Sequence, residues 1–156
     1  MSHPLEGTMA PDFTLDTDAG TPLTLSALRG RAVVLFFYPK DDTPGCTVES
    51  CEFRDLMPRF QDVGAEVLGI SPDDVKSHVK FRKKFDLPYP LLADVEHEVA
   101  EAYGVWQEKS MFALKYMGNV RTTFVIDRDG RVAKVFEKVK AAGHAAQVAD
   151  AVAALG

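Results

Sequence analysis

The chain has 156 residues, 46% of them hydrophobic and 26% charged, which is the composition of one ordinary globular domain spanning residues 1–156. Its 18 basic and 23 acidic residues give a formal net charge of −5, and no basic run exceeds three residues, so nucleic acid is not an expected partner. The chain begins without an apolar signal segment, and no stretch approaches the ~18 apolar residues of a membrane span. We therefore expect a cytoplasmic protein with no membrane partner.

The first predicted elements lead to one buried strand. Residues 5–13 form an extended lead-in, and residues 13–15 and 22–25 are expected to pair as a β-hairpin around the turn 18–20. One helical turn is expected at residues 26–29. The run 31–38 is β-branched and aromatic throughout, as is typical of a strand buried on both faces, and Pro39 ends it.

A helix is predicted directly after that strand. Thr43 is a good N-cap and Pro44 a good first helical residue, so Cys46 is expected in the opening turn. The apolar spacing continues to Val63, but Pro58 is expected to bend or interrupt the helix near residues 54–57. Another strand follows, which a right-handed crossover makes parallel to the first.

The second half of the chain continues the alternation of strands and helices. Ser71 is expected to cap a helix that starts at Pro72, and residues 106–118 are expected to form a loop that packs over the rest. The remaining predicted elements are strands at 66–70, 91–92, 122–126 and 131–136, a helix at 96–103, a turn at 127–130 and a helix at 144–155. This order predicts a thioredoxin-like α/β fold, a central mixed β-sheet flanked by helices, with an N-terminal β-hairpin extension.

The only two cysteines, Cys46 and Cys51, are where we expect the chemistry. In a first helical turn, unpaired backbone N–H groups and the helix dipole favour a thiolate, although Cys46 could also be a small buried apolar residue. In a cytoplasmic protein two cysteines indicate a redox or metal site rather than a structural crosslink. On one ideal helix their Cα atoms would lie about 8.5 Å apart, beyond the ~7 Å that a disulfide allows. A disulfide between them therefore requires residues 47–50 to unwind.

This spacing fits a thiol that reacts with a peroxide and is resolved afterwards. The Cys46 thiolate would attack a peroxide oxygen and become a sulfenic acid, which would then condense with Cys51. The Thr43 hydroxyl and the backbone N–H groups of Gly45 and Cys46 are candidates to hold the peroxide oxygens. Arg121 precedes a strand expected to end near Cys46. There the charge of Arg121 would favour the Cys46 thiolate and bind a peroxide oxygen. Without this context, Arg121 is more simply a solvated surface charge.

Other polar residues carry less information. The four histidines are scattered without metal-ligand spacing, so we interpret them as surface residues and expect no metal and no organic cofactor. Glu49 either orients Arg121 or is a solvated acid of the first helical turns.

The segment around Cys46 resembles the active-site motif of the peroxiredoxins, which reads Pro39-x-x-x-Thr43-x-x-Cys46 in this chain. The bacterioferritin-comigratory, or Q-type, class is similar over a larger part of the chain, from Ala10 to the end. The segments that carry this likeness are 37–55, 103–106, 108–111, 115–118 and 121–127.

The resemblance implies roles for five residues. Cys46 would be the peroxidatic thiol and Cys51 the resolving thiol, while Pro39, Thr43 and Arg121 would complete the site, with Pro39 shielding the reactive sulfur from solvent. It also implies hydrogen peroxide and organic hydroperoxides as substrates, and thioredoxin or a related dithiol protein as reductant. We expect a monomer, because Cys51 allows resolution within one chain.

Two alternatives remain. The first is a protein disulfide reductase on the same fold, although the chain lacks the C-x-x-C motif of thioredoxins. The second is a non-catalytic binding module in which oxidation unwinds the helix and exposes apolar surface. Turnover of a protein disulfide without peroxide would indicate the first, and oxidation-dependent partner capture with negligible peroxide turnover would indicate the second.

Overall fold

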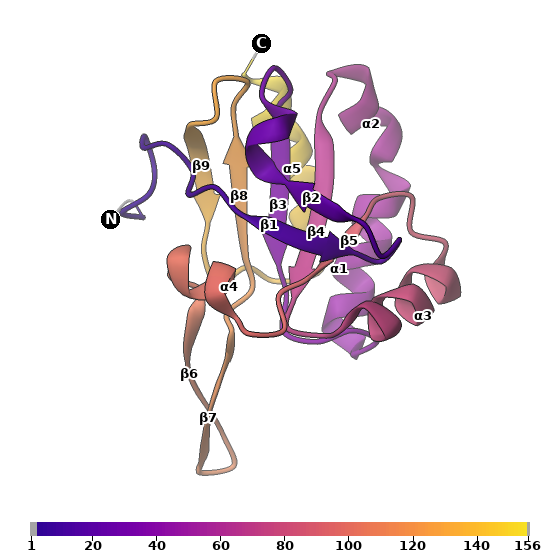
Figure 1. Cartoon of the computed structure of the whole chain (residues 1–156), viewed down its shortest axis with the longest axis vertical. Helices are drawn as coiled ribbons and strands as arrows, with labels where there is room; N and C mark the ends of the chain where they lie inside the picture. Colours follow the sequence, from indigo (N-terminus) through magenta and orange to yellow (C-terminus); the bar gives the residue numbers. More distant parts are fainter. Residues whose placement is uncertain (1–2, 156) are drawn as a thin grey trace.

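The structure, a computed structural model, describes residues 3–155 and is built on a seven-stranded sheet with helices on both faces (Figure 1). The strand order is β2-β1-β5-β4-β3-β8-β9, and β6 and β7 form a separate two-stranded sheet. The strands are β1 (Thr14–Thr17), β2 (Pro22–Thr24), β3 (Val33–Phe37), β4 (Glu66–Ser71), β5 (Leu91–Ala93), β6 (Trp106–Met111), β7 (Leu114–Asn119), β8 (Thr122–Ile126) and β9 (Val132–Phe136). The helices are the 3-10 turn η1 (Leu25–Leu28), α1 (Pro44–Asp55), α2 (Met57–Asp62), α3 (Val75–Phe85), α4 (Glu98–Ala102) and α5 (His144–Ala153). This mixed sheet flanked by helices confirms the predicted thioredoxin-like arrangement.

The predicted buried strand is β3, all five residues of which are buried. Because side chains alternate along a strand, β3 contributes to two cores. Val34 and Phe36 pack with α1, α2, α3 and α5, whereas Leu35 and Phe37 pack with α4 and the N-terminal segment on the other face. Phe36 stacks on Phe53 of α1 with ring centroids 4.6 Å apart, which ties α1 to the sheet.

The neighbours of β3 determine what lies near its end. It runs parallel to β4, with α1 and α2 in the crossover, which confirms the predicted β-α-β unit. On its other side it runs antiparallel to β8, and Phe37 is opposite Thr122. Since β8 starts where β3 ends, Arg121 lies beside the segment that leads from β3 into α1.

The N-terminal hairpin is confirmed and extends the sheet at one edge. β1 pairs with β2 through Leu15 and Leu23, and it also pairs antiparallel with β5. Asp18 in the hairpin turn accepts a hydrogen bond from the Leu91 N–H at 3.0 Å and forms an ion pair with Arg82 at 2.9 Å. These contacts hold the extension against β5 and α3.

The bend predicted from Pro58 is also confirmed. α1 ends at Asp55 and α2 begins at Met57, with Leu56 between them. Proline lacks an N–H and is tolerated only in the first turn of a helix, so the chain starts a new helix in which Pro58 occupies that turn.

The expectation of a packed loop at residues 106–118 is wrong. β6 and β7 form an antiparallel hairpin that projects from the body of the molecule (Figure 1). Its turn residues, Phe112 and Ala113, have positive φ values of 52° and 66°, a conformation that Asn-Gly or Gly-Gly would normally signal. The side chains of Phe112 and Leu114 are 95% and 71% exposed, so the hairpin leaves these two apolar residues of its tip unburied.

The start of α3 also differs from the prediction. Asp74, not Ser71, is its N-cap, and the Asp74 carboxylate accepts a hydrogen bond from the Ser77 N–H at 2.8 Å. Ser71 is the last residue of β4, and its hydroxyl donates to Asp73. Asp and Ser are about equally good N-caps. Because the Ser71 hydroxyl is bonded to Asp73 and the Asp74 carboxylate makes the cap hydrogen bond, the helix begins after Asp74. α4 is likewise shorter than its predicted range of 96–103.

The surface interpretation of the histidines is wrong for two of the four. His78 and His144 are 0% and 1% exposed. His144 Nε2 lies 2.7 Å from Thr123 Oγ1, and burial lowers the pKa of His144 to about 4, so the ring is neutral at physiological pH. His78 lies against the carboxylate of Asp41.

Candidate active site

The centre of the candidate site is Cys46, the third residue of α1. Its side chain is 1% exposed and belongs to the core between the sheet and α1. The first helical hydrogen bond of α1 runs from the Thr47 N–H to the Thr43 carbonyl at 2.8 Å. The N–H groups of Gly45 and Cys46 precede that bond, so they are free of helical partners.

Arg121 meets Cys46 as the sequence predicted. Its Nη2 donates to Cys46 Sγ at 3.4 Å, and its side chain is 15% exposed, so the interpretation as a solvated surface charge is wrong. The antiparallel register of β3 and β8 explains the meeting, because it places the start of β8 beside the end of β3. The Arg121 carbonyl also accepts from the Val139 N–H at 3.2 Å, which holds this backbone from the other side.

Glu49, one turn after Cys46, orients the guanidinium. Its Oε1 accepts from Arg121 Nη1 at 2.7 Å, and its side chain is 0% exposed, which decides between the two alternatives left by the sequence. Burial raises the pKa of Glu49 to about 7, although the charge and hydrogen bond of Arg121 act to lower it. Burial acts to lower the pKa of Arg121, but the charge of Glu49, the charge of Cys46 in its thiolate form and the hydrogen bonds to both raise it, so the guanidinium stays charged.

Gly45 allows the guanidinium to approach the helix. A Cβ atom at this position would lie 3.1 Å from Arg121 Nη2, tighter than an ordinary van der Waals contact. The absence of a side chain at residue 45 is therefore part of the geometry that brings Arg121 onto Cys46.

Thr43 and Pro39 lie in the segment that leads into α1. Thr43 occupies the N-cap position with an extended backbone, but its hydroxyl donates to the Lys40 carbonyl at 2.9 Å and does not cap the helix. Pro39 is half-buried and directly follows the buried Tyr38. No hydrogen bond within residues 3–155 joins Thr43 Oγ1 to Cys46, which lies three residues further along the chain.

Cys51 lies in the same helix as Cys46, and both are free thiols. Cys51 is half-buried, whereas Cys46 is buried. The hydroxyl of the buried Tyr89 donates to the carbonyl of Ser50 at 2.7 Å, which supports the helical turn between the two cysteines. With α1 continuous from Pro44 to Asp55, the five-residue spacing keeps the sulfurs on different faces.

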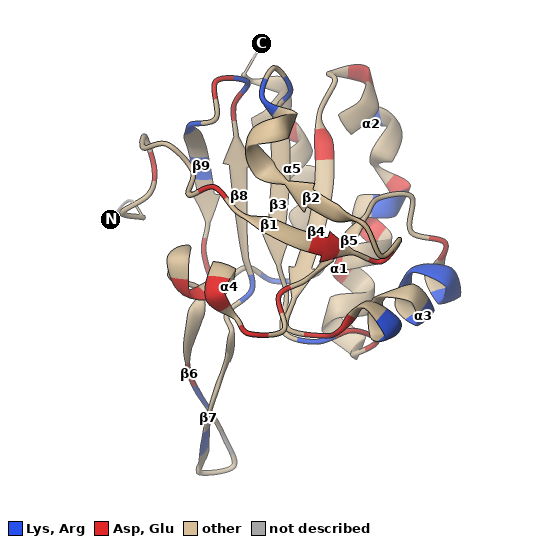
Figure 2. Ribbon diagram, in the orientation of Figure 1, with Lys and Arg blue, Asp and Glu red and all other residues tan. Residues whose placement is uncertain are grey.

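Lys109 is a further basic group near the site that the sequence analysis missed. It comes from β6 of the hairpin, whose two strands both carry basic residues (Figure 2). Its Nζ donates to the Asn119 carbonyl at 3.0 Å, and the Asn119 side chain donates to the Tyr38 carbonyl at 3.2 Å. Burial and the charge of Arg121 lower the pKa of Lys109, and the charge of Cys46 acts to raise it. Residues 108–111 belong to the segments that carry the family resemblance, but no role was assigned to Lys109, because the segment was expected to be a loop.

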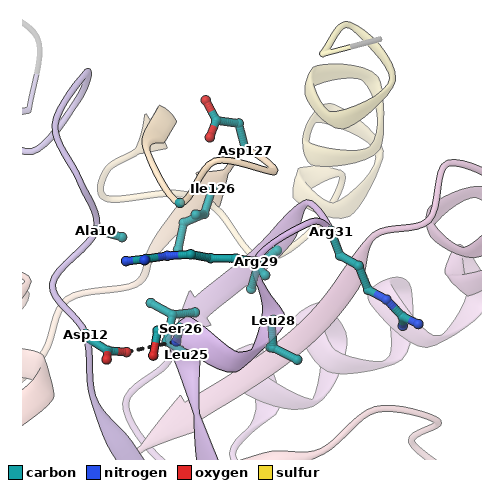
Figure 3. A pocket seen from close by; sticks show the side chains of 11 residues that line it. Ala10, Asp12, Leu25, Ser26, Leu28, Arg29, Arg31, Ile126 and Asp127 are labelled. Carbon is teal, nitrogen blue, oxygen red and sulfur yellow. Dashed lines mark hydrogen bonds between the residues drawn. The ribbon is translucent and has the colours of Figure 1, made fainter.

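A small cavity far from the cysteines in the fold does not form a ligand site. The cavity in Figure 3 lies between the N-terminal segment and η1, and its volume of about 10 Å³ is roughly what one water molecule needs. Asp12 at the edge of this cavity accepts from the Ser26 N–H at 2.9 Å, and the cavity lining contains neither cysteine nor Arg121.

In the part of the chain that the structure describes, no three metal-ligating side chains cluster, and no helix is long and apolar enough to cross a membrane.

Comparison with known proteins agrees with this geometry. Residues 7–135 match the model of the AhpC/TSA family. Peroxiredoxin Bcp of Bacillus subtilis is 48% identical over 141 residues, which cover 90% of each chain. The structure of the Xanthomonas campestris bacterioferritin comigratory protein, studied for its alkyl peroxide reduction activity, superposes with a TM-score of 0.88 at 40% identity and covers 92% of this chain and 91% of that one. Peroxidoxin BcpB of Mycobacterium tuberculosis, also 40% identical, superposes with a TM-score of 0.87 over 99% of both chains. The chain therefore belongs to the AhpC/TSA family, and within that family it is a peroxiredoxin of the bacterioferritin-comigratory, or Q-type, class.

Proposed function

We propose that the chain is a thiol peroxidase that reduces hydrogen peroxide and organic hydroperoxides at Cys46. The observation that carries this proposal is the contact between the charged Arg121 and Cys46 Sγ at 3.4 Å, next to the free N–H groups of the first turn of α1. The Cys46 thiolate attacks one peroxide oxygen and the O–O bond breaks. The sulfur is oxidised to a sulfenic acid, and the other oxygen leaves as hydroxide or alkoxide and takes a proton from solvent.

Three kinds of donor would hold the peroxide during this step. The Arg121 guanidinium stabilises the negative charge that develops on the departing oxygen, and the N–H groups of Gly45 and Cys46 point from the helix terminus toward the same oxygens. The Thr43 hydroxyl keeps its acceptor lone pairs while it donates to Lys40, and it can exchange that bond for the substrate. Pro39 covers the approach to the sulfur from the β3 side.

Cys51 would resolve the sulfenic acid within the same chain. Its thiolate attacks Cys46 Sγ, a disulfide forms as the S–O bond breaks, and the sulfenic oxygen leaves as hydroxide, which takes a proton from solvent to become water. Because the ideal-helix separation of about 8.5 Å exceeds the ~7 Å limit of a disulfide, the turn around residues 47–50 must unwind first. A dithiol protein such as thioredoxin then reduces the disulfide by two thiol exchanges and restores both thiols. No metal or organic cofactor takes part in these steps.

A single peptide tests this chemistry. Trypsin cleaves after Lys40 and Arg54, so one peptide carries both Cys46 and Cys51. We expect this peptide, taken from protein treated with one equivalent of hydrogen peroxide, to be lighter by the mass of two hydrogens. We also expect thioredoxin, with its reductase and NADPH, to sustain peroxide turnover. A disulfide-linked dimer as the main product would contradict resolution within the chain. Oxidation without turnover would favour the redox-switched binding module instead.

We also propose a monomer, because resolution by Cys51 needs no second subunit. The cytoplasmic location and the single domain expected from the sequence stay predictions.

A further inference from the structure

A buried polar cluster adjoins the segment that carries Pro39 and Thr43. At its centre is Asp41, which is 7% exposed. The Tyr38 hydroxyl donates to Asp41 Oδ1 at 2.6 Å, and the Ser77 hydroxyl donates to Asp41 Oδ2 at 2.8 Å. The cluster therefore joins the end of β3 to the first turn of α3, although neither Asp41 nor α3 contributes to the peroxide chemistry described above.

His78 completes this cluster, and its two ring nitrogens both face acceptors. Nε2 lies 2.8 Å from the carbonyl oxygen of Leu92, which can only accept a hydrogen bond. Nδ1 lies 2.7 Å from Asp41 Oδ2, which already accepts from the Ser77 hydroxyl. Beside an ionised Asp41, both nitrogens can be satisfied together only if each carries a hydrogen, so the geometry favours an imidazolium paired with the Asp41 carboxylate.

The surroundings of His78 favour this charged form. The titratable groups that face the cluster are Asp41 and Tyr38 from the β3 side and Asp73 from the β4–α3 loop, while β5 contributes only the Leu92 carbonyl. Burial acts to lower the pKa of His78, but the hydrogen bond and charge of Asp41, the hydrogen bond to Leu92 and the charge of Asp73 raise it above its ordinary value.

The cluster fixes the course of the backbone on the β3 side of Cys46. Tyr38 and Asp41 are on either side of Pro39, and the Asp41 N–H donates to Asp73 Oδ2 at 2.7 Å. The segment is therefore held by its side chains and by its backbone at once. We propose that His78 is a positioning residue for peroxide reduction, which clamps Asp41 and so fixes the segment that carries Pro39 and Thr43 and leads into the first turn of α1 at Cys46. This inference rests on the proposed function of Cys46.

The clamp has a defined dependence on pH. Because the folded protein binds the His78 proton more tightly than the unfolded chain, the stabilisation is fully present below the ordinary histidine pKa of about 6.5. It is lost as the pH rises through the raised pKa of the folded protein. A neutral ring leaves one of its two acceptors without a donor, and the segment from Tyr38 to Thr43 is then less firmly held.

The test compares His78→Gln with Arg82→Met, a matched control on the same helix. The Gln amide nitrogen cannot donate to both Asp41 and Leu92, which lie on opposite sides of the ring. Arg82 donates to the Leu87 carbonyl at 2.9 Å and to Asp18, so its loss weakens α3 without touching the segment. Rapid-mixing measurement of Cys46 thiol loss with hydrogen peroxide is made on each protein under conditions where unfolding curves show it fully folded.

We expect His78→Gln to react about 10- to 100-fold more slowly than wild type, as small misplacements of positioned groups do, and Arg82→Met to react at the wild-type rate. Nuclear magnetic resonance of protein with isotope-labelled histidine should show two protonated ring nitrogens for His78 at neutral pH. A neutral His78 ring, or equal rates in wild type and His78→Gln, would overturn the inference. Wild type reacting as slowly as a free thiol would instead refute the proposed function.

A milder variant keeps the inference testable if His78→Gln does not fold. Ser77→Ala removes one hydrogen bond to Asp41 and leaves the ring in place. We expect its peroxide rate to fall in the same direction by a smaller factor. A rate equal to that of wild type in Ser77→Ala would then count against the clamp.

Discussion

The Nη2 atom of Arg121 lies 3.4 Å from Cys46 Sγ, although 75 positions separate the two residues in the chain. The contact depends on the antiparallel pairing of β3 and β8, on the charge of Glu49 at 2.7 Å from the other guanidinium nitrogen and on the small size of Gly45. Gly45 and Glu49 can each be altered by a single substitution, and the two substitutions have different expected results.

Gly45→Ala should slow peroxide reduction with little change in stability. The added Cβ would meet Arg121 Nη2 at 3.1 Å and displace the guanidinium, which we expect to lower the rate about tenfold or more. Alanine is the better helix former by up to about 1 kcal/mol, whereas the displaced guanidinium pairs less well with the buried Glu49, so the two effects on the free energy of unfolding should largely offset each other. Val48→Ala, an exposed position of α1, is the control and should retain the wild-type rate. A Gly45→Ala enzyme as fast as wild type would show that the close approach is not required.

Glu49→Gln should remove part of the pH dependence of stability. The folded pKa of Glu49, about 7, lies above its ordinary value of 4.5. Its contribution to stability is therefore fully present below pH 4.5 and is lost as the pH rises through about 7, at up to ~1.4 kcal/mol for each pKa unit. Urea unfolding below and above this pH window should show that the free energy of unfolding falls less with rising pH in Glu49→Gln than in wild type. Glu98→Gln, at an exposed position, is the control and should show the same fall as wild type. If the free energy of unfolding falls equally in Glu49→Gln and in wild type, the raised pKa of Glu49 is refuted.

Cys51→Ser should separate the two oxidation steps. The first reaction with peroxide should keep its wild-type rate, because Arg121 and the helix terminus are unchanged. Without a resolving thiol the sulfenic acid persists, and excess peroxide converts it to sulfinic acid. The mass of the tryptic peptide that ends at Arg54 would report this as the gain of two oxygens. If wild type over-oxidises equally, or if the first step of the variant is as slow as a free thiol, Cys51 has another role.

Lys109→Met should reduce the positive charge at the site while keeping the aliphatic part of the side chain. We expect the peroxide rate to fall about two- to fivefold, which corresponds to the ~0.5–1 kcal/mol typical of a partly exposed charge interaction, and to fall less at high salt. Lys115→Met is the control, because Lys115 lies on the same hairpin with a side chain that is 75% exposed. Equal effects of the two substitutions would indicate a general change in charge rather than a contribution at the site.

Much of the fold was predictable from local signals. The continuous apolar run identified β3, Pro44 identified the start of α1 and Pro58 identified its end, because each acts through its own backbone chemistry. The β6–β7 hairpin was missed because Phe112 and Ala113 take positive φ values without the Gly or Asn that would signal them.

The chemistry of the site was also partly predictable, whereas its supporting contacts were not. The placement of Cys46 in a first helical turn follows from Thr43 and Pro44, and the position of Arg121 follows from topology. The burial of Glu49 and His78 depends on packing between elements distant in the sequence, which spacing along one helix does not reveal. The same holds for Lys109, whose contact with Asn119 requires a hairpin that was not predicted.

One rate tests most directly the claim that Arg121 and Cys46 form a peroxide-activating site. It is the rate at which reduced protein loses its Cys46 thiol to one equivalent of hydrogen peroxide, measured by rapid mixing for wild type and Arg121→Ala. We predict that wild type reacts orders of magnitude faster than free cysteine at equal thiolate fraction, and that Arg121→Ala loses about 100-fold or more of this rate. A wild-type rate like that of free cysteine, or an unchanged rate in Arg121→Ala, would contradict a peroxide-activating site built from these two residues.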